Sequence, residues 1–277
     1  MITSEQINSM NYVEFISFIQ ETNRCPGGKF TIHDIAKESL ITKRSMVLEI
    51  GSNTGFSSLE LSRISGCKCV GIEPVRDAVK IANKIKKSDI YKIRKNVKFI
   101  CASAYDIPFK SNKFDLIVAG GATSFMDNKK KAIEEYYRVL KPWGLLSVTN
   151  LFYQTRPPKK VLDNLEKVLG IRIQPWSDKE WLELIVNNSK LNLYLLKKYK
   201  LFPKSNKELE EYVEFFIKKQ HIKKLPENVK KTIYDKWLGI LKIFNENHKY
   251  LGFFFALFRK DYIFEEPELF NKIERIE

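Results

Sequence analysis

The segment with the clearest chemical pattern is a glycine-containing turn at residues 47–58, VLEIGSNTGFSS. The apolar residues before the turn predict a buried strand, and the residues after it predict a helix. Gly51 and Gly55 allow the backbone to turn tightly and to approach a ligand closely. Because open α/β sheets bind ligands at the carboxyl ends of their strands, this turn, with Ser52 and Asn53 between its glycines, is a candidate binding site.

The turn does not match a dinucleotide-binding fingerprint, which would place glycine at positions 51, 53 and 56. Asn53 and Phe56 occupy two of these positions, so an NAD site is disfavoured. An acidic residue, Glu73, lies before Pro74 at the end of the next predicted strand. An acid about 20 residues after such a turn is placed to accept both hydroxyls of a ribose. We therefore predict that Glu73 is a ribose ligand; the alternative is an exposed acid at a strand end.

The elements that position these residues alternate between short apolar runs and helical patterns from residue 46 onward. The predicted strands are 47–50, 69–72, 97–101, 116–119 and 145–149, with helices near 57–65, 75–87 and 129–139. This βαβ order predicts the α/β fold class, with a parallel sheet covered by helices on both faces.

The remainder of the chain predicts two more strands, 193–202 and 251–260, joined by a long segment of helical pattern. A connection of this length is uncommon within a compact domain and often forms a functional lid. We therefore predict a helical lid insertion at 206–249 within a single domain spanning 46–277.

Residues 1–45 predict a helical N-terminal flap that precedes this domain. Ser4 is placed to cap a first helix that carries apolar residues up to Ile19. The residues 31–34, Thr-Ile-His-Asp, predict a capping box that begins a second helix.

Four segments, taken in order, resemble class I S-adenosylmethionine-dependent methyltransferases. VLEIGSNTGFSS resembles motif I, VGIEP at 70–74 resembles the strand end that follows it, and SAYDIPF at 103–109 is similar to the adenine-clamping segment. YRVLKPWG at 137–144 resembles the RVLKPGG signature before the fifth strand. The resemblance implies the class I methyltransferase Rossmann-like fold, with a seven-stranded, mostly parallel sheet whose last strand is antiparallel. It also implies S-adenosyl-L-methionine as cofactor and S-adenosyl-L-homocysteine as product.

The resemblance also implies roles for individual residues. Glu49 would organise the turn around the methionine ammonium of the cofactor. Ser103 stands where the family has an aspartate and is a weaker, uncharged acceptor for adenine. Trp143 stands where the signature has glycine, which suggests a changed turn. The predicted cofactor-binding residues are Glu49, Gly51, Ser52, Asn53, Gly55, Glu73, Pro74, Ser103, Ala104 and Gly120.

The motifs do not identify the acceptor or its reacting atom. The [DN]PP[FY] element of nucleobase amino-methyltransferases is absent at the end of the fourth strand, and the chain contains no Pro-Cys dipeptide for cytosine C5 chemistry. His33 is a candidate general base, although a polar residue on the outer face of a helix is the favoured alternative. The candidate substrate-binding residues, on the flap, strand ends and insertion, are Arg24, Phe30, Phe125, Tyr153, Arg156 and Trp237. For the aromatic residues of the insertion, packing onto the core is the favoured alternative.

Composition sets limits on the partner. The net charge is +15, but the excess is spread along the chain and consists mainly of lysine, whereas bidentate readers of phosphate and guanine tend to be arginine. We therefore predict a small-molecule acceptor and consider nucleic acid unfavoured. An RNA or protein methyltransferase, or a non-catalytic methyltransferase-like partner subunit, are the alternatives.

Cysteine spacing and hydropathy complete the predictions. The four cysteines show no CxxC spacing and no accompanying histidine pair, so we predict no metal site and reduced thiols. No apolar run is long enough to cross a bilayer, and the first residues do not resemble a signal peptide. These features predict a cytoplasmic protein that does not enter a membrane, and they do not predict an oligomeric state.

Overall fold

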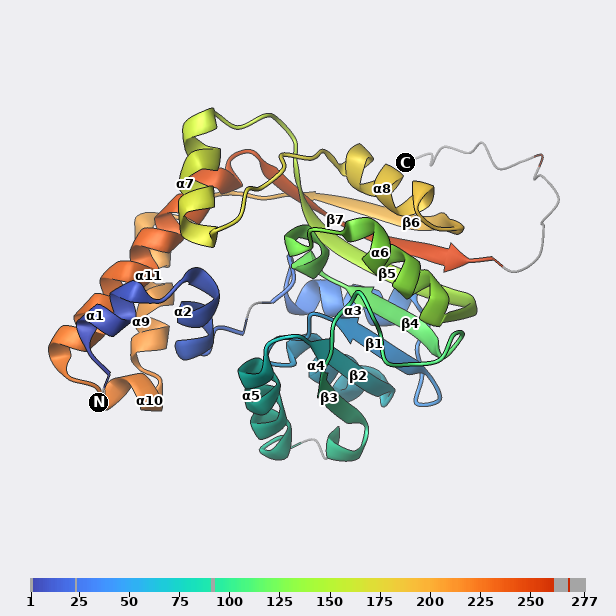
Figure 1. Ribbon diagram of the computed structural model, residues 1–277, viewed down its shortest axis with the longest axis horizontal. Coiled ribbons are helices and arrows are strands. Elements are labelled where there is room, and N and C mark those ends of the chain that lie inside the picture. Colours follow the sequence, from blue (N-terminus) through green and yellow to red (C-terminus); the bar gives the residue numbers. More distant parts are fainter. Residues whose placement is uncertain (1, 23, 91–92, 262–268, 270–277) are drawn as a thin grey trace.

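The computed structural model describes residues 2–22, 24–90, 93–261 and 269 (Figure 1). Within these residues, seven strands form one sheet in the order β3-β2-β1-β4-β5-β7-β6. The strands are β1 (Met46–Ile50), β2 (Lys68–Glu73), β3 (Val97–Cys101), β4 (Phe114–Ala119), β5 (Leu140–Tyr153), β6 (Leu191–Lys200) and β7 (Leu251–Lys260). β1 to β5 pair in parallel, and β7 pairs antiparallel with both β5 and β6. This confirms the predicted α/β fold with an antiparallel last strand.

Helices cover both faces of the sheet. On one face, α3 (Lys29–Glu38), α4 (Phe56–Ser65) and α5 (Arg76–Lys87) contribute buried residues such as Ile35, Leu59 and Ala82 to an apolar layer. On the other face, α6 (Lys129–Val139) and α8 (Asp178–Asn187) contribute Ile133 and Trp181. Two short 3₁₀ helices, η1 (Ile93–Lys95) and η2 (Gly121–Phe125), lie in the connections. The sheet is buried on both faces, as its almost continuous apolar strands require.

A second group of helices packs apart from the sheet, and we call it the helical cluster. It consists of α1 (Ser4–Ser9), α2 (Tyr12–Phe18), α9 (Asn206–Ile217), α10 (Gln220–Lys223) and α11 (Glu227–His248), with α7 (Lys159–Leu169) alongside α11 (Figure 1). Its core combines residues from both ends of the chain: Ile7, Phe15, Ile16, Ile19, Val213, Phe216, Ile222, Val229, Ile233, Trp237 and Ile240. The residues of the predicted flap therefore divide, because α1 and α2 join the insertion whereas α3 packs on the sheet.

Two lysines of the insertion tie the N-terminal helices into this cluster. Nζ of Lys236 donates to the backbone oxygens of Ile7 and Met10, each at 2.7 Å, and to that of Asn8. Nζ of Lys219 donates to the oxygen of Ile19 at 3.1 Å and to that of Gln20 at 2.5 Å. The last carbonyls of a helix have no partner within the helix, so these ammonium groups satisfy acceptors that would otherwise need water.

Local signals at the N-terminus differ from the predictions in three places. The N-cap of α1 is Thr3 rather than Ser4, which is the first residue of the helix. The first predicted helix is two helices, because the side chain of Asn11 accepts from the backbone of Glu14 and starts α2 with its own capping box. The capping box predicted at residues 31–34 is wrong, since α3 already begins at Lys29. Thr31 lies inside that helix, and its hydroxyl donates to the oxygen of Pro26 at 2.6 Å.

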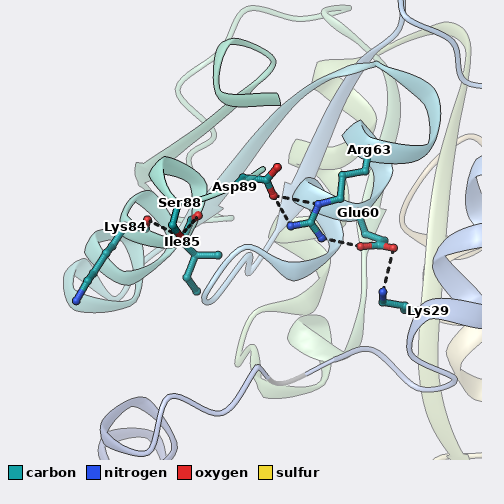
Figure 2. Close-up of polar contacts among 7 residues, drawn as sticks. All are labelled: Lys29, Glu60, Arg63, Lys84, Ile85, Ser88 and Asp89. Atoms are coloured by element: carbon teal, nitrogen blue, oxygen red, sulfur yellow. Dashed lines mark hydrogen bonds and ion pairs between the residues drawn. The ribbon is translucent and has the colours of Figure 1, made fainter. Parts of the chain in front are cut away.

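A charged network holds the outer side of α4, the helix that follows the glycine turn (Figure 2). Nη1 of Arg63 lies 2.8 Å from Oε2 of Glu60, and Nε of Arg63 donates to Oδ2 of Asp89 at 3.0 Å. Oε1 of Glu60 lies 3.5 Å from Nζ of Lys29 at the start of α3. The network therefore connects α3, α4 and the segment after α5 around two buried carboxylates, those of Glu60 and Asp89.

Candidate functional site

The glycine turn lies at the carboxyl end of β1 and adopts a conformation that its two glycines permit. Gly51 has φ 66° and Gly55 has φ 90°, both in the left-handed region. A Cβ on Gly51 would lie 2.5 Å from Cβ of Ala122, and one on Gly55 would lie 2.3 Å from the ring of Phe99. Both the backbone angles and the close packing therefore require glycine, as the sequence predicted.

Glu49 lies directly beneath this turn and is only 6% exposed. Its Oε2 accepts from the backbone N–H of Ser58 at 3.0 Å and from the Ser58 hydroxyl at 2.6 Å. Because Ser58 belongs to the first turn of α4, the carboxylate satisfies an otherwise unpartnered helix-end donor. Burial raises the pKa of Glu49 to about 7, against the opposing effect of the serine hydrogen bonds. An incoming cation would favour the ionised form of this carboxyl group.

Glu73 lies at the end of β2, next to the same turn. Its Oε2 accepts from the backbone N–H of Asn53 at 2.9 Å, and its Oε1 accepts from the N–H of Val75 at 3.0 Å. At 8% exposure the residue is buried, so the alternative of an exposed acid at a strand end is wrong. Each oxygen retains capacity to accept another hydrogen bond. The geometry fits the pair of hydroxyls of a ribose, and Pro74 follows at the surface.

The remaining predicted cofactor residues lie at neighbouring strand ends. Ser103 is exposed after β3, and its Oγ accepts from the N–H of Tyr105 at 3.1 Å. Ala104 follows it, and Gly120 directly follows β4. Ser52 is buried, and its Oγ has no hydrogen-bond partner among the described residues. The parallel strands therefore bring the predicted residues to one edge of the sheet.

The N-terminal segment also reaches this edge. Cβ of Cys25 would lie 3.8 Å from a Cβ built on Gly120. Burial raises the pKa of the Cys25 thiol to about 12, and the charge of Glu49 adds to the effect. Sequence reasoning did not identify Cys25 as a site residue, because a single cysteine in a Pro/Gly loop carries no positional signal.

Arg24 lies beside the turn, with Cζ 5.0 Å from the ring centroid of Phe56, the first residue of α4. Its charge also acts on Tyr212 of α9, whose hydroxyl donates to Oε1 of Glu21 at 3.0 Å. Arg24 is therefore an exposed cation between the glycine turn and the helical cluster. In this position its guanidinium is accessible to an anionic group.

Several candidate acceptor residues have other partners. Trp237 is 2% exposed in the core of the helical cluster, with its ring 6.0 Å from that of Phe15, so it does not form a pocket wall. The hydroxyl of Tyr153 donates to Oδ1 of Asn247 at 3.1 Å and fastens α11 to β5. Phe30 packs edge-on against Tyr199 of β6 at 5.7 Å.

The other three candidates are exposed. His33 lies on the outer face of α3, where its ring makes no hydrogen bond with another described residue. This agrees with the favoured alternative to a general base, a polar residue on the outer face of a helix. Phe125 is 53% exposed at the end of η2, and Arg156 is exposed on the loop after β5. Of these residues, only Phe125 adjoins the strand end that carries Gly120.

Asn150 is a site residue that the sequence did not reveal. Its Oδ1 accepts from the hydroxyl of Ser124 at 2.8 Å and from the N–H of Leu151 at 3.1 Å. The bond from Ser124 fixes η2, the turn that packs on Gly51, to β5 near its end. An asparagine at a strand end has no motif of its own, so only the packing of η2 against β5 shows this role.

Comparison with known proteins agrees with the fold and the turn. Residues 48–148 match a family described as "Methyltransferase domain". Over these residues the chain is similar to that family, and the sheet order agrees with the predicted methyltransferase fold. The crystal structure of the MccD protein superposes with a TM-score of 0.74 at 24% identity, covering 86% of this chain and 100% of that chain.

Two curated relatives match over part of their length. An uncharacterized protein of Haemophilus influenzae is 25% identical over 169 residues, 60% of this chain and 66% of the relative. A ubiquinone/menaquinone biosynthesis C-methyltransferase, UbiE, of Psychromonas ingrahamii is 30% identical over 164 residues, 59% of this chain and 62% of that enzyme. The chain therefore spans slightly less than two thirds of the length of these relatives.

Two features are absent from the described residues. No helix in that part of the chain is long and apolar enough to cross a membrane. In the same residues, no three His, Cys, Asp or Glu side chains come together as a metal site would require.

Proposed function

We propose that this protein is an S-adenosylmethionine-dependent methyltransferase that acts on a small-molecule acceptor. The observation that carries the proposal is the pair of buried carboxylates, Glu49 and Glu73, which hold the two sides of one glycine turn through backbone N–H groups. One carboxylate is placed for an ammonium group and the other for ribose hydroxyls. The name of the Psychromonas relative supports the reaction type.

The chain has the groups needed for binding and orientation. When bound, the cofactor would supply an electrophilic methyl group on its sulfonium sulfur, with S-adenosylhomocysteine as the leaving group. Glu49, Glu73 and the turn fix the donor, so that catalysis rests largely on positioning. Any proton leaves the acceptor to solvent or to a base that the described residues do not identify.

We propose that the helical cluster covers the acceptor. The insertion leaves the sheet after Lys200 and returns at Leu251. Lys200 pairs with Gly252, and both ends of the insertion lie near the same edge as the glycine turn because β7 is antiparallel to β5 and β6. Arg24, beside the glycine turn, and Phe125, at the end of η2, remain as acceptor-site candidates. An exposed guanidinium at this position favours an acceptor with a carboxylate or phosphate group.

Calorimetric titration with S-adenosylmethionine and S-adenosylhomocysteine tests the cofactor assignment. Glu73→Ala and Glu73→Gln should each weaken binding by about tenfold or more, because charge-assisted hydrogen bonds to the ribose are lost. Asp77→Asn is the matched control, since Asp77 is an exposed acid four residues away that pairs only with Lys80 among the described residues. Equal affinities in all three variants, with the fold intact, would reject the assignment.

Turnover to S-adenosylhomocysteine against a panel of anionic metabolites tests the acceptor class. Salt-dependent binding of RNA would instead favour the nucleic-acid alternative. Tight cofactor binding without turnover on any acceptor, including proteins, would favour a non-catalytic subunit.

A further inference from the structure

The opposite edge of the sheet contains a hollow, which the methyltransferase proposal does not use. It lies at the amino ends of β1, β4 and β5, close to the end of α3, and has a volume of about 310 Å³. This volume is at the lower limit of small-molecule sites. Its lining residues are Ser39, Leu40, Ile41, Arg44, Ser45, Asp115, Pro142, Trp143, Gly144 and Leu145.

Two of the lining residues are strained. Leu40 has φ 52° and Trp143 has φ 64°, in the left-handed region that is unfavourable for bulky side chains. Their side chains are 80% and 49% exposed, so core packing does not compensate for the strain. Trp143 adopts a left-handed backbone conformation, which glycine adopts without strain. Backbone strain of this kind concentrates at ligand-binding sites, where a side chain is retained for function.

The shape of β5 presents Trp143 to the hollow. Phe114 pairs with Leu140 and Leu116 pairs with Leu145, so that residues 141–144 loop out opposite the single residue Asp115. Cζ of Arg259 lies 5.0 Å from the indole centroid. The indole is therefore held by a neighbouring cation while half of its surface remains accessible.

The charges around the hollow leave one cation without a carboxylate. Asp115 accepts from Nζ of Lys141 and from the N–H of Met46, each at 2.7 Å, so its own charge is compensated. The exposed guanidinium of Arg44 forms no ion pair with another described residue. The hollow thus combines an accessible indole with an uncompensated guanidinium.

We propose that this hollow binds a small planar anion, an aromatic carboxylate. Its ring packs on the indole of Trp143, and its carboxylate pairs with Arg44. Arginine forms bidentate hydrogen bonds with carboxylates, and aromatic rings gain from offset or edge contacts with an indole. The site is separate from the methyl-transfer site and does not depend on that activity.

Titration of the full-length, ¹⁵N-labelled protein with salicylate tests the proposal. The indole N–H signal of Trp143, assigned by its loss in Trp143→Gly, should shift in a saturable way. Cyclohexanecarboxylate, which lacks the aromatic face, and benzamide, which lacks the charge, should bind at least about tenfold more weakly, since either loss removes about 1.4 kcal/mol of binding energy. Arg44→Gln should weaken salicylate binding by the same factor, whereas Lys43→Gln, at the adjacent exposed lysine, should not.

Three outcomes of this titration would overturn the proposal. Absence of a saturable shift up to about 10 mM, where binding energies fall below those of specific sites, would reject it, as would equal shifts with benzamide. Equal affinities of the Arg44→Gln and Lys43→Gln variants would exclude the anion subsite.

Thermal denaturation tests the argument from strain separately. Trp143→Gly should raise the melting temperature by about 2–4 °C, because glycine adopts this backbone conformation without strain. The same variant should give no salicylate signal in ligand-observed saturation transfer. An unchanged or lower melting temperature, or retained salicylate binding, would show that Trp143 is not kept there for a ligand.

Discussion

The carboxyl edge of the sheet and the helical cluster use charged side chains in opposite ways. At the sheet edge, Glu49 and Glu73 accept hydrogen bonds from backbone N–H groups and keep capacity for more. In the cluster, Lys219 and Lys236 donate to backbone carbonyls that end α1 and α2. Buried carboxylates that can accept further hydrogen bonds are suited to bind a ligand. Ammonium groups that donate to backbone carbonyls instead join the helices to one another. The comparison leads us to expect that the proposed cofactor binds at the sheet edge, whereas these lysines hold the helical cluster together.

Removal of the cluster's central aromatic residue is expected to have the largest effect. Trp237→Ala should destabilise the protein by about 3–5 kcal/mol, because it leaves a large cavity among Phe15, Phe216 and their neighbours. Trp237→Phe is the control and should cost much less, since the indole N–H has no hydrogen-bond partner among the described residues. Chemical denaturation measures both values. If the sheet edge and the helical cluster are independent, cofactor affinity stays unchanged under folded conditions. A parallel loss of affinity would show that the two regions are coupled.

Removal of the ammonium group of Lys236 should have the next largest effect. Lys236→Met keeps the apolar stem but removes three donors from the carbonyls at the end of α1. We expect a loss of about 1–3 kcal/mol, the typical range for hydrogen bonds to a charged group. Lys242→Met, on the same helix, is the control. Similar stability of the two variants in urea denaturation would show that the carbonyls are satisfied equally well by water.

The pH dependence of cofactor binding tests the sheet edge. The pKa of Glu49 is about 7 without ligand, and a bound ammonium favours the ionised carboxylate. Affinity should therefore fall as the pH decreases below about 7, by up to about tenfold per pH unit. Calorimetry at pH 6, 7 and 8 measures this slope, and Glu49→Gln should flatten it. A slope that persists in the variant would assign the titration to another group.

The same group links pH to stability. Because the folded-state pKa of Glu49 is raised, the unliganded protein should lose stability as the pH rises from about 4.5 to about 7, where only the unfolded chain is ionised. Thermal denaturation of Glu49→Gln should lack this decline. An identical decline in the variant and the wild type would contradict the link.

Replacement of Ser103 should have the smallest effect. Ser103→Asp should be tolerated and should tighten cofactor binding by a few-fold at most, about 0.5–1 kcal/mol, because a carboxylate is a stronger acceptor for an amino group. The Asp side chain can still accept from the N–H of Tyr105, as Ser103 does now. Ser103→Ala is the comparison variant in the same titration. Abolished binding in the aspartate variant would show that this loop does not contact the adenine.

The packing of the insertion determines how a deletion of residues 206–249 would be interpreted. The sequence predicted residues 206–249 as a separable lid, but α9, α10 and α11 share their core with Ile7, Phe15 and Ile16. A deletion would expose these residues to water, so it would not test the lid alone. Single substitutions such as Trp237→Phe are therefore the cleaner probes of this region.

The sequence by itself determined the sheet and its turn, because these depend on local patterns. The apolar runs, Gly51, Gly55 and the acid Glu73 occupy positions whose spacing along the chain already defines a βαβ unit with a strand-end site. The parallel register then carries these residues to one edge without further information.

Only the tertiary structure decided how the distant segments combine. The pairing of α1 and α2 with the insertion, the role of Lys236 at the end of α1, and the burial of Trp237 depend on contacts between residues more than 200 positions apart. The sequence also did not predict the left-handed conformation of Trp143, because the turn around this residue sets its φ. Amphipathic helices show which face is apolar, but they do not show which partner covers that face.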